Sequence, residues 1–129
     1  MEFDPVTFSL RAGWLGMLGG VLSGALMGLF FLKPNWMGGY GSQPRRLVRL
    51  GPISFFGYGL LNLFYALSLT PLEVPLTAGR WGALSFALAL VAMPTCCFLT
   101  AWRQSMRHLF PVPVLSAGAG IAIILLKGF

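Results

Sequence analysis

The residues best placed to do chemistry are polar side chains inside an otherwise apolar stretch. They recur at intervals of four, four, three and three, and they are Ser54, Tyr58, Asn62, Tyr65 and Ser68. This spacing places all five on one face of a helix. Amides and phenols are costly in hydrocarbon without partners, so we expect this face to look into a bundle, a cavity or a neighbouring subunit. Two interpretations stay open: interhelical hydrogen bonding, or a pocket for a quinone, pigment, lipid or small solute.

The sequence offers little else for catalysis or metal binding. His108 is the single histidine, and no second imidazole or carboxylate cluster accompanies it to complete a metal or haem site. The acids Glu2, Asp4 and Glu73 lie outside the apolar stretches, so no intramembrane carboxylate is present for proton coupling. We predict a protein that is not an enzyme, has no metal site, and requires no cofactor, although a bound lipid, quinone or pigment is compatible with it.

The elements that carry these residues follow from composition and from the positions of the charges. Hydrophobic residues make up 57% of the chain and charged residues only 9%, against about 25% charged in an average soluble domain. Charges divide the sequence into uncharged windows at 12–32, 50–72, 81–102 and 109–126. Each window approaches or exceeds the ~20 residues that a membrane-spanning helix needs, and none alternates as a barrel strand would. We predict one all-α transmembrane domain over 1–129, a compact bundle of four helices near 8–32, 50–70, 81–102 and 112–127.

Small residues form a regular row in the first of these helices. Gly16, Gly20, Gly24 and Gly28 recur every four residues, and the last helix carries a shorter version in Ser116 and Gly120. In lipid, such rows allow two helix backbones to approach closely and gain dispersion contacts. We predict that these residues pack helices together, through a contact between the first and fourth helices or with a different polypeptide.

The basic residues are unevenly distributed between the two ends of the predicted bundle. The first and third connections carry Lys33, Arg45, Arg46, Arg49, Arg103 and Arg107, whereas the opposite end carries Arg11, Arg80 and Lys127. The positive-inside rule then places both termini on the non-cytoplasmic side. The cluster Lys33, Arg45, Arg46 and Arg49 is either a patch for anionic lipid or an acidic partner surface, or a determinant of topology alone. No nucleic-acid module is present, so we expect no nucleic-acid partner.

These features favour one function and leave two alternatives. The leading hypothesis is a non-catalytic accessory or scaffolding subunit of a larger complex, respiratory or photosynthetic, in a bacterial-type inner or energy-transducing membrane. Its expected partners are membrane lipids and other integral membrane subunits. The first alternative is a homo-oligomeric channel or carrier for small solutes, and the second is a quinone- or pigment-binding module.

Overall fold

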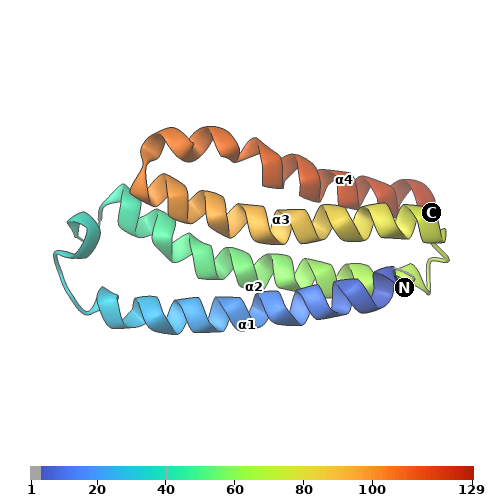
Figure 1. Cartoon of the computed structure of the whole chain (residues 1–129), viewed down its shortest axis with the longest axis horizontal. Helices are drawn as coiled ribbons and strands as arrows, with labels where there is room; N and C mark the ends of the chain where they lie inside the picture. The colour runs from blue at the N-terminus through green and yellow to red at the C-terminus, as the bar shows by residue number, and fades with distance from the viewer. Residues whose placement is uncertain (1–3, 40) are drawn as a thin grey trace.

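The computed structural model describes residues 4–39 and 41–129, and it consists of four long helices (Figure 1). They are α1 (Pro5–Phe31), α2 (Gln43–Leu69), α3 (Leu76–Trp102) and α4 (Pro111–Lys127). Two short 3₁₀ helices, η1 (Trp36–Gly38) and η2 (Gln104–Leu109), lie in the first and third connections. The described residues contain no strand, and four helical segments are long and apolar enough to cross a membrane. The predicted all-α, four-helix integral membrane fold is therefore confirmed.

The first three helices begin earlier than the charge boundaries predicted. The Asp4 carboxylate caps α1 by accepting hydrogen bonds from the backbone N–H groups of Val6 and Thr7. The Ser42 hydroxyl oxygen accepts from the N–H of Arg45 at 3.3 Å, which starts α2 at Gln43. A capped first turn tolerates charge in the aqueous interface. In α1 and α2 the charges therefore mark where the apolar span begins, whereas the caps mark where the helix begins.

The helices lie in a curved row in the order of the sequence, with α1 and α4 on the outer sides (Figure 1). Each packs against its sequence neighbour, and α1 also touches α3. The expected contact between the first and fourth helices is wrong, because α4 packs on α3. The Ser116 hydroxyl donates to the carbonyl oxygen of Ser85, and the Phe86 ring fills the space beside Gly120.

The buried core lies mainly between α2 and α3. Tyr65 and Leu69 of α2 meet Ala83 and Phe86 of α3, and the Tyr65 and Phe86 rings lie 5.0 Å apart between centroids. Aromatic pairs at this distance add to the dispersion gained by packing. The buried hydrophobic cluster therefore joins the central pair of helices.

Candidate functional site

The polar face of α2 is directed largely at α3. The Asn62 side-chain nitrogen donates to the carbonyl oxygens of Tyr58, at 2.7 Å, and Phe86, at 3.2 Å. The Tyr65 hydroxyl donates to the carbonyl oxygen of Gly79 at 2.6 Å. Since Phe86 and Gly79 belong to α3, two of the five predicted residues bond the backbone of this helix directly. These bonds join α2 and α3 inside the membrane, where no water competes for them.

Asn62 is the most buried member of this face, with an exposed fraction of 0%. Its two neighbours are both carbonyl acceptors, so the amide must present its NH₂ group to them. Its oxygen Oδ1 is then buried without a hydrogen-bond partner among the described residues. Asn62 thus combines a structural bond with one unsatisfied acceptor.

The two serines of the face bond within their own helix. The Ser54 hydroxyl donates to the carbonyl oxygen of Leu50, and that of Ser68 to the carbonyl oxygen of Phe64, both at 2.7 Å. Bonds to the residue four positions earlier satisfy a hydroxyl without a neighbouring helix. The Ser54 oxygen also lies 3.9 Å from the Cys97 sulfur, and that cysteine is buried and not disulfide-bonded. The serines therefore place no free hydroxyl toward a ligand.

The glycine row of α1 does not follow a single neighbour. A Cβ on Gly16 would meet the Leu90 side chain of α3, whereas one on Gly20 would lie 2.9 Å from the Pro52 carbonyl oxygen of α2. A Cβ on Gly24 would make only an ordinary contact with Pro52, and one on Gly28 would meet nothing within 4 Å. At 3.6 residues per turn, a four-residue repeat rotates about 40° around the helix per step. The glycine row therefore turns away from α2 and α3 toward the C-terminal end of α1.

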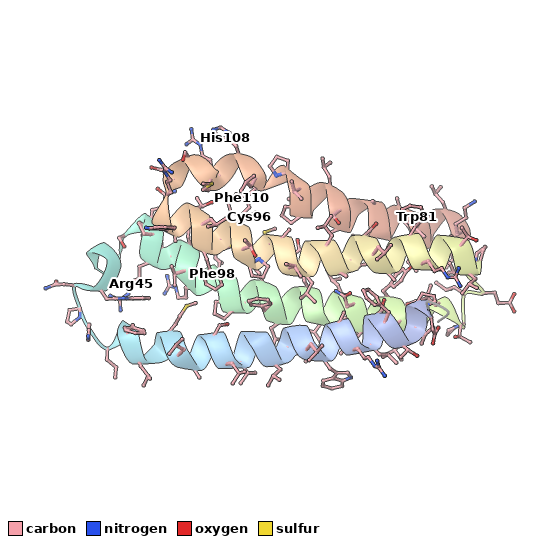
Figure 2. All side chains as sticks on the ribbon, in the orientation of Figure 1. Arg45, Trp81, Cys96, Phe98, His108 and Phe110 are labelled. Carbon is pink, nitrogen blue, oxygen red and sulfur yellow. The ribbon has the colours of Figure 1, made fainter. Side chains whose placement is uncertain are left out.

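The four predicted basic residues separate into one buried and three exposed side chains. Arg45 is 1% exposed, and its Nη1 donates to the carbonyl oxygens of Lys33, Pro34 and Trp36 at 3.0–3.4 Å. Figure 2 shows this side chain at the first loop. Lys33, Arg46 and Arg49 are exposed around it. Arg45 therefore holds the loop together, and the other three present their charge outward.

A groove that the sequence did not reveal runs between α1 and α3, with a volume of about 800 Å³. Its apolar walls include Leu15 and Gly16 of α1 and Ala87, Leu90 and Val91 of α3. Asp4, Thr7 and Arg11 line its other end. Ligand pockets commonly have ~300–1,000 Å³. The polar face of α2 supplies none of its five predicted residues to this groove.

The groove could not be predicted from the sequence because its walls come from different helices. The spacing of residues within one helix does not reveal how two helices are rotated relative to each other. The available signals were Arg11 at the edge of an apolar window and Gly16 five residues after it. Gly16 matters because it leaves room for the Leu90 side chain, which is buried at the α1–α3 contact.

The carboxylate at the groove end is held in its charged form. The pKa of Asp4 is lowered from its usual 3.8, first by the Thr7 hydroxyl, which donates to Oδ2 at 2.6 Å, and then by the N–H groups of Val6 and Thr7. Desolvation opposes this shift only in part. Asp4 is therefore a negative charge at neutral pH.

Comparison with protein-family models, with curated proteins and with solved structures found no match. In the described part of the chain, no three His, Cys, Asp or Glu side chains gather where they could hold a metal ion.

Proposed function

We propose that this protein is a non-catalytic accessory subunit of a larger membrane assembly, in which α1 provides a docking face for a transmembrane helix of another chain. The observation that carries the proposal is the open end of the glycine row. Gly24 and Gly28 lie four residues apart, and this chain places at most one light contact on them.

The open glycines are costly unless another helix uses them. Glycine in a helix interior is about 1 kcal/mol less favourable than alanine, and without a neighbour it contributes no side-chain packing. A pair of small residues four apart is the arrangement that lets transmembrane helices approach closely. Only 17% of the most apolar window of α1 is buried within the chain, as in α4, against 44% for the inner helix α3, so the open glycines and not the exposure distinguish α1. A partner helix on α1 would recover the contacts that this chain leaves unmade.

The charges support an orientation for this docking face. Gly28 lies near the first loop, where Lys33, Arg46 and Arg49 are exposed. Under the positive-inside rule this end is cytoplasmic and both termini are on the other side. The three exposed cations would then face anionic headgroups or an acidic partner surface beside the same end of α1.

The channel and the quinone or pigment alternatives have less support. Both require polar groups on α2 that are free to meet a solute or cofactor. Four of the five residues of this face are engaged elsewhere: Asn62 and Tyr65 donate to backbone oxygens, and Ser54 and Ser68 bond within α2. The accessory role needs no such free groups.

The test is isolation of the tagged full-length chain from its native membrane in mild detergent, with native mass and co-purifying chains measured on one sample. We expect a foreign integral membrane subunit in fixed stoichiometry. The variant Gly24→Leu/Gly28→Leu should keep its helix content and lose that subunit, whereas Leu22→Ile should retain it. A homo-oligomer with no foreign chain would refute the accessory role and favour the channel.

A further inference from the structure

The groove between α1 and α3 opens to the membrane along its side. Leu15 and Val91, which stand on its two walls, are 66% and 62% exposed. Its inner surface includes the buried Leu90 side chain and Phe55 of α2. An elongated apolar molecule could therefore enter from the bilayer without opening the bundle.

The dimensions of the groove match one leaflet of a bilayer. Its lining on α1 extends from Asp4 to Gly16, which corresponds to about 18 Å at ~1.5 Å per residue. One leaflet contributes about half of the ~30 Å hydrocarbon core plus its headgroup layer. Asp4 and Arg11 lie outside the uncharged window of α1, and Gly16 lies inside it. The groove thus runs from the headgroup level toward the middle of the membrane.

The polar end of the groove carries one cation and one anion. Within the described part of the chain, the Arg11 guanidinium has no ion-pair partner and no side-chain hydrogen bond. Asp4 accepts three short-range bonds from its own helix turn, but a carboxylate has about four acceptor sites and Asp4 remains exposed. A guanidinium recognises phosphate by paired hydrogen bonds, and a carboxylate recognises an ammonium group.

We propose that this groove binds one phosphatidylethanolamine-type phospholipid. An acyl chain lies along Leu15, Ala87 and Leu90, the headgroup phosphate bonds to Arg11, and the headgroup ammonium bonds to Asp4. Charge complementarity disfavours an anionic glycerol headgroup, which would satisfy Arg11 but meet the Asp4 carboxylate with no positive charge. A choline headgroup carries the positive charge but has no N–H to donate to Asp4, so its bond to the carboxylate would be weaker. A quinone would leave both charges unused. The groove uses residues 4–16 of α1, whereas the proposed docking face lies at Gly24 and Gly28. The two proposals therefore stand independently.

The experiment is native mass spectrometry of the delipidated full-length protein, resupplied with equimolar phosphatidylethanolamine, phosphatidylglycerol and phosphatidylcholine. We expect one bound phosphatidylethanolamine, favoured about fivefold over each competitor, since exposed charge pairs contribute modestly. Arg11→Gln should weaken all three lipids by about tenfold. Asp4→Asn should erase the preference over phosphatidylglycerol, because asparagine keeps the helix cap but loses the charge.

Matched variants separate binding from folding. Ala87→Phe should fill the groove and abolish retention, whereas Leu88→Phe, one residue away and outside the lining, should not. Lys127→Gln removes a cation elsewhere and should also leave binding unchanged. Equal binding of all three lipids by the wild type and Arg11→Gln would overturn the proposal. So would a preference for phosphatidylglycerol that Asp4→Asn does not alter, or a quinone found bound in the sample before delipidation.

Discussion

Gly13 and Gly59 pack reciprocally across the α1–α2 interface. A Cβ on Gly13 would lie 2.8 Å from the Gly59 carbonyl oxygen, and a Cβ on Gly59 would lie 2.8 Å from the Gly13 carbonyl oxygen. Each backbone therefore occupies the space that a side chain on the other would need. This pair fixes the distance of closest approach between the two helices.

Gly59→Ala should consequently destabilise the bundle by about 1–3 kcal/mol, because the added methyl forces the two backbones apart. Gly57→Ala is the matched control, since a Cβ at that position meets nothing within 4 Å. The control should be neutral or slightly stabilising, because alanine favours helix. Reversible unfolding in mixed micelles measures both, and equal stability of the two variants would contradict the interface.

Asn62 provides a test of polarity in the core. Asn62→Leu removes two hydrogen bonds but also removes the unpartnered Oδ1, so we expect a change within about 1 kcal/mol. Asn62→Asp turns a carboxylate toward the carbonyl oxygens of Tyr58 and Phe86 and should cost about 3 kcal/mol. The same unfolding assay compares them, and equal tolerance of Leu and Asp would show that this position is not buried.

Arg45 should govern the order of the first loop. Arg45→Gln removes the guanidinium that donates to the carbonyl oxygens of Lys33, Pro34 and Trp36, so the loop amides should exchange hydrogen at least about tenfold faster. The Gly39 N–H, which donates to the Trp36 carbonyl oxygen, is a convenient reporter. Arg46→Gln changes an exposed neighbour and should leave exchange unaltered. Unchanged protection in Arg45→Gln would refute the assigned role.

The first turn of α1 should respond to acid. Because the folded pKa of Asp4 lies below its usual 3.8, the charged cap stabilises the turn above that usual value. This stabilisation is lost as the pH falls through the folded pKa. The protection of the Val6 and Thr7 amides relative to their intrinsic exchange rates should fall over that acidic range, and Asp4→Asn should show no such transition. A transition of equal size in Asp4→Asn would exclude the carboxylate as its cause.

Composition and charge were sufficient to predict the number and approximate positions of the helices. Membrane spans impose a length and an apolar content that any sequence must show. The neighbours of each helix were not predictable in the same way. Gly16 and Gly20 belong to one sequence pattern, yet Gly16 accommodates Leu90 of α3 and Gly20 approaches Pro52 of α2.

For the candidate sites, too, the sequence predicts which residues share a helix face but not what they contact. The spacing of the polar residues predicts one helix face for Asn62 and Tyr65, but only the packing of α3 reveals which backbone oxygens they reach. The sequence grouped Arg45 with Lys33, Arg46 and Arg49 by charge. Its burial under the loop depends on the path of residues 33–39, which local composition does not specify.

The row arrangement of the helices also sets an order of assembly during synthesis. Since each helix packs against the one made just before it, α1 and α2 can close their glycine contact while α3 is still being translated. The second wall of the groove arrives only with α3. The groove is therefore complete only once the third helix lies beside the α1–α2 hairpin, and its open side then faces the bilayer.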